Sequence, residues 1–129
     1  MPVKEVAMRP SLALSIGAVL AFIFGAALAL LPDQMLAGFG LATPKEALVV
    51  SRDVGVTLIG LGIINWLGRE ATGQLARALL LGNLFIQVAE AVVNGWEVAA
   101  GILPSPAAGG VVLHVILAVV FALGLRRVA

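Results

Sequence analysis

Four long apolar stretches dominate the pattern of hydrophobic and polar positions along the chain. A helix that rises ~1.5 Å per residue needs ~20 residues to cross the ~30 Å hydrocarbon core of a bilayer, and each stretch is close to this length. A chain that crosses lipid must also satisfy its own backbone hydrogen bonds, which favours helices. The pattern therefore predicts an all-α, integral membrane, antiparallel four-helix bundle, formed as a single domain over residues 1–129. The predicted spans are about Ser11 to Leu31, Glu46 to Leu67, Gln74 to Trp96 and Ala107 to Leu125.

The composition excludes several other classes of protein. The chain is 61% hydrophobic and 12% charged, with a mean hydropathy of +1.12, whereas water-soluble domains carry ~25% charged residues. Cysteine is absent, which excludes disulfides and thiolate chemistry. His114 is the only histidine, so one chain cannot build a zinc site from several histidines. The net charge of +1 gives no overall field to attract nucleic acid. We therefore expect a lipid bilayer as partner, no nucleic acid and no metal.

The first apolar stretch could be a cleaved signal peptide or a retained span. Lys4 and Arg9 precede it, and Ala27-Leu28-Ala29 resembles a cleavage site. However, the uncharged run from Pro10 to Pro32 is longer than the ~7–15 residues of a signal-peptide core. We expect a retained first transmembrane helix.

The distribution of positive charge predicts the orientation of the bundle. Cationic residues concentrate in the N-terminal tail, the loop between the second and third spans, and the C-terminus, and the opposite side holds only two, Lys45 and Arg52. Because positive residues favour the cytoplasmic side, we expect a multi-pass protein with both termini in the cytoplasm. The six residues on that side are Lys4, Arg9, Arg69, Arg77, Arg126 and Arg127.

Two loops carry further predictions. The segment from Asp33 to Thr43 is apolar but too short to span a membrane, so we expect it to lie at the interface or to fold over the mouth of the bundle. The loop from Gly68 to Gly73 is tight, which predicts that the second and third spans are antiparallel neighbours.

The third span carries a polar row. Asn83, Gln87, Glu90 and Asn94 follow one another at steps of four, three and four, which places them on one helix face. Polar groups that contact lipid are costly, so this row should face the interior of the bundle.

Depth in the membrane predicts which other polar residues join the row. Arg52 and Asp53 in the second span, Glu90 in the third and His114 in the fourth should fall at one level of the outer half. There they could neutralise one another, with His114 paired to Glu90. Two interpretations stay open: a buried ion-pair network that fixes helix register, or a small-ligand site. The candidate ligand-binding residues are Arg52, Asp53, Asn83, Gln87, Glu90, Asn94 and His114.

The second span and its neighbours resemble a known group of proteins. The run SRDVGVTLIGLGIINWL from Ser51 to Leu67, with Phe39-Gly40-Leu41 before it and Gly82-Asn83-Leu84 after it, is similar to small bacterial four-helix membrane proteins of the DoxX-like type and their uncharacterised relatives. The resemblance extends over about residues 11–125 and implies the same four-helix fold and a location in the bacterial inner membrane. Some DoxX-like proteins are linked to quinone reduction, so the resemblance also implies a quinone-adjacent role by analogy.

The sequence leaves two functions open and assigns no catalytic residue. One is a non-enzymatic accessory subunit or small-ligand-binding protein with a polar cavity in the outer half of the bundle. The alternative is a quinone-reactive or other redox-linked enzyme subunit that uses Glu90 and His114 as an acid–base pair. No cofactor is predicted, although quinone, or haem with His114 as axial ligand, stays open. Rows of small residues at helical spacing also favour a homo-oligomer or a place in a larger membrane complex, with a small hydrophobic ligand as a further partner.

Overall fold

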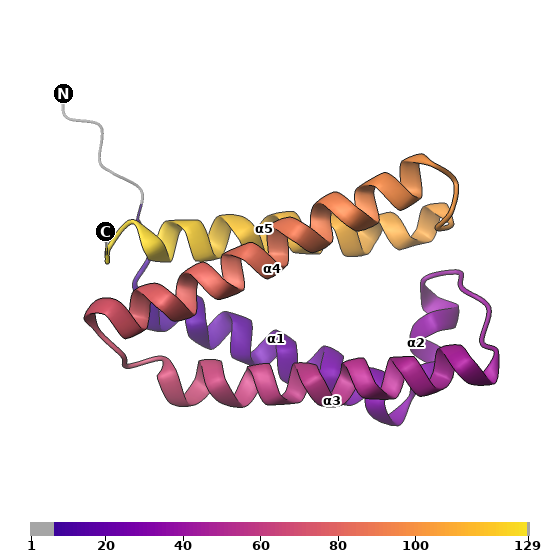
Figure 1. Cartoon of the computed structure of the whole chain (residues 1–129), viewed down its shortest axis with the longest axis horizontal. Coiled ribbons are helices and arrows are strands. Elements are labelled where there is room, and N and C mark those ends of the chain that lie inside the picture. The colour runs from indigo at the N-terminus through magenta and orange to yellow at the C-terminus, as the bar shows by residue number, and fades with distance from the viewer. Residues whose placement is uncertain (1–6, 129) are drawn as a thin grey trace.

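The computed structural model describes residues 7–128, and all regular elements in this range are helices (Figure 1). Four helices are long and apolar enough to cross a membrane. Their bounds lie within three residues of the predicted spans, so the prediction of an all-α chain with four membrane-length helices is confirmed. The elements are α1 (Pro10–Leu30), α2 (Pro32–Gly38), α3 (Lys45–Gly68), α4 (Gly73–Ala99), the 3₁₀ turn η1 (Ser105–Ala107) and α5 (Ala108–Leu125).

Proline and glycine set the ends of these helices. Pro10 and Pro32 open α1 and α2, because the first helical residue needs no amide hydrogen and favours the φ of proline. Gly40 and Gly101 follow α2 and α4 with φ of 74° and 73°. At both ends the two closing hydrogen bonds of a Schellman motif form: Gly40 and Leu41 donate back to α2, and Gly101 and Ile102 donate back to α4. The chain therefore turns sharply at both places.

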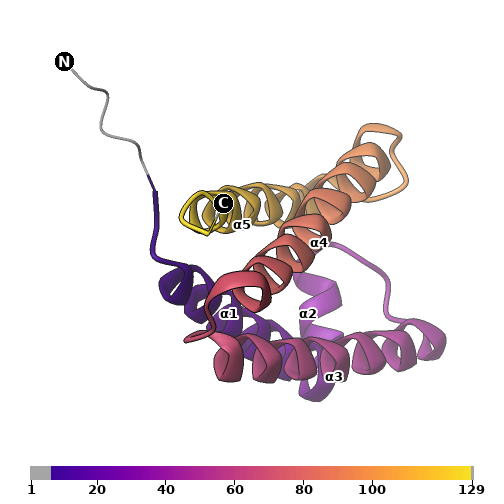
Figure 2. The ribbon, with the colours of Figure 1, turned by 60° about the vertical axis from the view of Figure 1, so that its left-hand side comes forward.

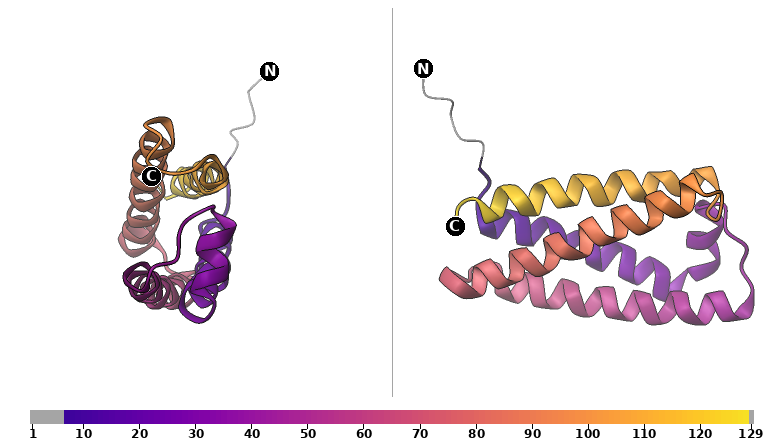
Figure 3. Two further views of the ribbon diagram at one scale, coloured as in Figure 1. Left: turned by 90° about the vertical axis from the view of Figure 1, so that its right-hand side faces the viewer. Right: turned by 45° about the horizontal axis from the view of Figure 1, so that its top comes forward.

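The long helices form two layers. In Figure 1, α1 and α3 make the lower layer and α4 and α5 the upper one, and the chain reverses its direction from each long helix to the next. The start of α1 and the end of α5 lie at one end of the molecule together with the α3–α4 loop (Figure 3, right). We call this the proximal end. The distal end carries α2 and the connection from α4 to α5.

The second and third spans are not close neighbours along their length. Helix α3 packs on α1, and α4 packs on α5, whereas α3 and α4 contact each other at few positions. In Figures 1 and 2, α4 moves away from α3 toward the distal end. The expectation from the tight 68–73 loop is therefore wrong for the distal parts of α3 and α4, because a short connection fixes only the helix ends that it joins.

Small residues explain why α1 and α3 approach so closely. A Cβ atom at Gly55 would lie 2.5 Å from the backbone nitrogen of Ala29 and 2.6 Å from the carbonyl oxygen of Gly25. The backbones of the two helices are thus in direct contact, as is common where membrane helices pack through glycine and alanine. Ser51 strengthens the contact, since its hydroxyl donates to the carbonyl oxygen of Leu28 at 3.4 Å.

The apolar core lies in the proximal half. Phe121 fits against Gly17, where a Cβ atom would come within 2.5 Å of the ring, and Leu80 fits against Gly124. Aromatic and leucine side chains thus fill the space that these glycines leave free. The buried core residues are Ala13, Leu14, Leu80, Leu117 and Phe121.

The segment after α1 folds over the distal mouth of the bundle. It begins with the short helix α2, which packs on α1 and α3, and Phe39 then lies within 4 Å of the position that a Cβ atom at Gly110 would take. The end-on view shows α2 and the following residues reaching from the α1–α3 layer toward the α4–α5 layer (Figure 3, left). Of the two alternatives for this segment, the structure has the folded-over one.

Candidate functional site: a cavity with one polar wall

A cavity of about 370 Å³ opens between the two layers in the distal half. This volume falls within the ~300–1,000 Å³ of small-molecule sites. One wall is apolar and comes from α1, α3 and the segment around α2. The other wall carries the polar row of α4 together with His114 of α5. The apolar wall includes Leu20, Phe24, Leu28, Met35, Phe39, Val54, Leu58 and Leu61, and the polar wall includes Asn83, Gln87, Glu90, Asn94, Glu97 and His114.

A pair of amides closes the cavity toward the proximal end. The Asn65 amide nitrogen donates to Asn83 Oδ1 at 2.9 Å, and the Asn83 nitrogen donates back to Asn65 Oδ1 at 2.7 Å. Asn83 also donates to the carbonyl oxygen of Leu79 at 2.9 Å. Asn65 is fully buried and Asn83 is 3% exposed. The pair therefore joins α3 to α4 at the level where these helices begin to separate.

About one helical turn further toward the distal end of α4, Gln87 contacts His114. The Gln87 Oε1 atom lies 2.7 Å from His114 Nδ1, and Gln87 is more than nine-tenths buried. Because a carbonyl oxygen only accepts hydrogen bonds, Nδ1 carries the hydrogen and donates. In the neutral ring this leaves Nε2 as an acceptor. Gln87 thus fixes both the position and the tautomer of the half-buried imidazole.

Glu90 and Asn94 form the next level of the polar wall. The Asn94 amide donates to Glu90 Oε2 at 3.1 Å, one turn further along α4. Glu90 is exposed to the open space of the cavity, and Glu97 continues the wall toward the distal mouth. The predicted polar row of α4 therefore does face the interior, as one continuous wall.

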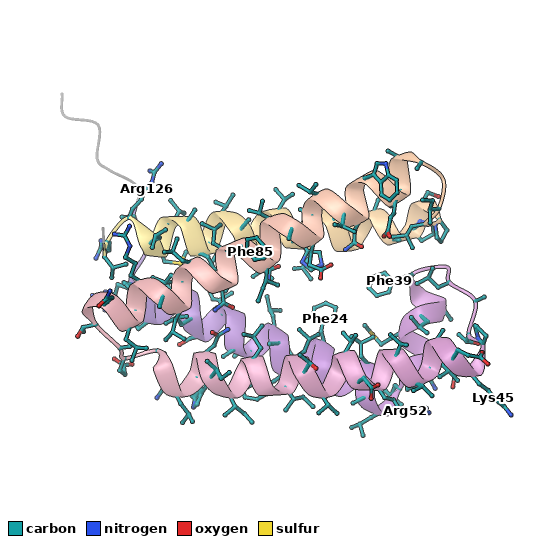
Figure 4. All side chains as sticks on the ribbon, viewed as in Figure 1. Phe24, Phe39, Lys45, Arg52, Phe85 and Arg126 are labelled. Atoms are coloured by element: carbon teal, nitrogen blue, oxygen red, sulfur yellow. The ribbon has the colours of Figure 1, made fainter. Side chains whose placement is uncertain are left out.

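Arg52 and Asp53 do not join this wall. Both are exposed and neither lines the cavity, and Arg52 points away from it in Figure 4. At ~100° per residue, Arg52 lies roughly 160° around α3 from Val54, which does face the cavity. The two residues were grouped with Glu90 and His114 because of a shared depth, but a shared depth does not give a shared helix face.

The predicted ion-pair network is also absent from the part of the chain that the structure describes. His114 binds Gln87 rather than Glu90. The one ion pair within 4 Å among residues 7–128 joins Arg69 to Glu70 at the proximal end. Of the seven candidate residues, the structure thus brings five together: Asn83, Gln87, Glu90, Asn94 and His114.

Asn65, Phe24 and Phe39 belong to the site or its border but were not among the candidate residues from the sequence. Asn65 had a usable signal, because it continues the row of small residues on α3 at helical spacing. Phe24 and Phe39 had none, since a half-buried aromatic residue in an apolar stretch resembles any residue in contact with lipid. In the structure both rings project into the space between the layers (Figure 4).

The two walls of the cavity offer groups that can bind a small molecule. Within the described residues no group of three or more histidine, aspartate or glutamate side chains is placed to hold a metal ion. What the wall offers is hydrogen-bonding groups at successive depths, opposite an apolar surface. Such a site can hold a molecule that has one polar end.

Comparisons of the chain with protein-family models, with curated proteins and with solved structures found no match. The resemblance to the DoxX-like type therefore stays a prediction from sequence, and the cavity itself carries the functional argument.

Proposed function

We propose that the chain is a non-enzymatic, multi-pass protein of the bacterial inner membrane that binds a small amphiphile in the distal cavity. In the proposed orientation the helices form an antiparallel bundle with both termini in the cytoplasm, because the cationic side of the chain is the proximal end. The cavity then lies in the outer half of the membrane.

The observation that carries this proposal is the contrast between the two walls of the cavity. A purely structural polar network would pair its members with one another, as Asn65 and Asn83 do. Glu90 instead faces a cavity of about 370 Å³. A polar group in a membrane span that faces open space is a functional candidate, since it destabilises the protein without joining two helices.

The separation of α3 from α4 supports entry from the bilayer. Val54 on α3 lines the cavity and is 44% exposed, and the two helices contact each other at few positions. An amphiphile dissolved in lipid could therefore pass between them without leaving the membrane.

Two neighbouring glycines of α5 allow a matched test. Gly110 lines the cavity, and a Cβ atom there would meet nothing nearer than the Phe39 ring at 3.9 Å. Gly109 is exposed outside the cavity and has nothing within 4 Å. Gly110→Leu should therefore fill the cavity without disturbing the fold, and Gly109→Leu should leave the cavity open.

The probes are radiolabelled decylamine, decan-1-ol and decanoate, offered to the protein in phosphatidylcholine nanodiscs with empty nanodiscs as background. We expect saturable binding of at least one probe by the wild type and by Gly109→Leu. Gly110→Leu should bind it at least about tenfold more weakly, which is a loss of ~1.4 kcal/mol. If none of the three binds saturably, or if both variants bind equally, the proposal is wrong.

A further inference from the structure

We infer that the cavity selects amphiphiles whose polar end is a hydrogen-bond-donating cation, such as a primary alkylammonium, over neutral or anionic molecules with the same tail. This inference rests on the proposed function and names the ligand class of the same site.

The charged groups of the wall are all of one sign. Glu90 and Glu97 line the cavity, and within residues 7–128 no lysine or arginine does. The cations of α3 do not compensate them, because Arg52 and Lys45 both point away from the cavity in Figure 4. A ligand that brings its own positive charge would supply the missing partner, whereas a carboxylate or phosphate would be repelled.

The hydrogen-bonding groups of the wall favour a donor. Glu90 offers carboxylate oxygens, of which Oε2 already accepts from Asn94, so the Asn94 amide holds the carboxylate in place. His114 Nε2 adds an acceptor whenever the ring is neutral, because Gln87 occupies Nδ1. An ammonium group has three donors and no acceptor, so it has donors for both Glu90 and His114. A quinone or an ester offers only acceptors and would leave these groups without partners.

The opposite wall suits the same ligand. Phe24 and Phe39 line the cavity and extend into it from α1 and from the segment after α2 (Figure 4). The faces of aromatic rings attract cations, most strongly where water is excluded. The aliphatic tail would lie along Leu28, Leu58 and Leu61, which belong to the same wall. The cavity thus presents acidic groups, aromatic rings and an apolar surface within one volume.

The experiment is the ranking of the three decyl probes, which share one tail and differ in the charge of the head. Because hydrogen bonds to charged groups contribute ~1.5–3 kcal/mol, we expect wild-type protein to bind decylamine about 10- to 100-fold more tightly than decan-1-ol or decanoate. Equal affinities, or tighter binding of the alcohol or of decanoate, would overturn the inference and leave the proposed function intact. Absence of any saturable binding would instead refute the proposed function.

A pair of acidic residues provides the matched variants. Glu90→Gln should reduce the affinity for decylamine to about that for decan-1-ol. Asp53→Asn, which removes an acid of α3 outside the cavity, should leave the preference for the amine unchanged. If Glu90→Gln keeps the full preference, Glu90 is not the counter-ion and the inference is wrong. Should Glu90→Gln fail to fold, the wild-type ranking decides the question alone.

Discussion

The proximal and distal halves of this bundle use polar residues in opposite ways. In the proximal half, Asn65 and Asn83 satisfy each other and are sealed within the protein. In the distal half, Glu90 accepts a hydrogen bond from Asn94 on its own helix and otherwise faces the cavity. The presence of a polar side chain inside a membrane span therefore does not by itself indicate its role. Its partners and the space in front of it distinguish a structural role from a binding role.

Different inward-facing residues occupy the two halves. On the distal part of α4 these are Gln87, Glu90 and Asn94, which line the cavity. In the proximal half, Leu14 and Phe121 are fully buried and fill the space between the helices. We therefore call the proximal half the closed half and the distal half the open half.

The largest expected effect is a difference in the free energy of unfolding between variants of Phe121 and Phe24. Both rings border the cavity, but Phe121 is fully buried in the proximal core, while Phe24 is only half-buried. Phe121→Ala should lower the free energy of unfolding by about 2–3 kcal/mol, below the ~3–5 kcal/mol of water-soluble cores because lipid also shields the ring after unfolding. Phe24→Ala removes a ring that is already partly exposed and has fewer packing contacts to lose, so it should cost less than about 1 kcal/mol. Unfolding in mixed micelles with increasing dodecyl sulfate measures both, and equal losses would contradict the division into a closed and an open half.

The next effect concerns the contact between α1 and α3. Gly55→Ala places a methyl group against the backbone of α1, and such overpacking should destabilise the protein by about 1–3 kcal/mol. Gly60→Ala lies on the same helix with nothing within 4 Å, so it should be neutral or stabilise by up to ~1 kcal/mol through helix propensity. Thermal unfolding in detergent compares the two variants. If both behave alike, the backbones of α1 and α3 are not in the close contact described here.

The sequence was enough to predict the all-α class and the four long helices, because lipid imposes a helix length and an apolar composition that can be read directly. It also predicted the polar face of α4, since the steps from Asn83 to Asn94 have the helical period. It could not predict which residues of the other helices lie opposite this row. Arg52 was placed by depth alone, and its angular position around α3 depends on the Gly55 contact with α1, which is a tertiary feature. The gap between α3 and α4 likewise depends on how two helix pairs meet rather than on any local pattern.

A smaller effect tests the amide pair that separates the two halves. Asn65→Leu should cost about 1 kcal/mol, because it leaves the buried amide of Asn83 with one partner fewer. Asn83→Leu should cost a similar amount, and the double variant should lose less than the sum of the two. Double-mutant cycles between membrane helices give ~0.6–1.7 kcal/mol, and we expect a coupling energy in this range from dodecyl sulfate unfolding. Strict additivity would show that the two amides do not depend on each other.

The smallest effect is the most informative about the open half. Glu90→Gln should change the free energy of unfolding by less than about 0.5 kcal/mol, as at an exposed site. The glutamine oxygen can still accept from the Asn94 amide, and no ion pair within 4 Å is lost in the described part of the chain. Unfolding of ligand-free protein in mixed micelles measures this change, with Asn65→Leu as the reference for a polar residue in the closed half. A loss of 1 kcal/mol or more would mean that Glu90 helps to hold the helices together, and the distal half would then be a second closed core rather than a binding site. A negligible loss of stability together with loss of decylamine binding would show that Glu90 serves binding and not folding. That result is expected if the distal half binds the ligand and the proximal half holds the helices together.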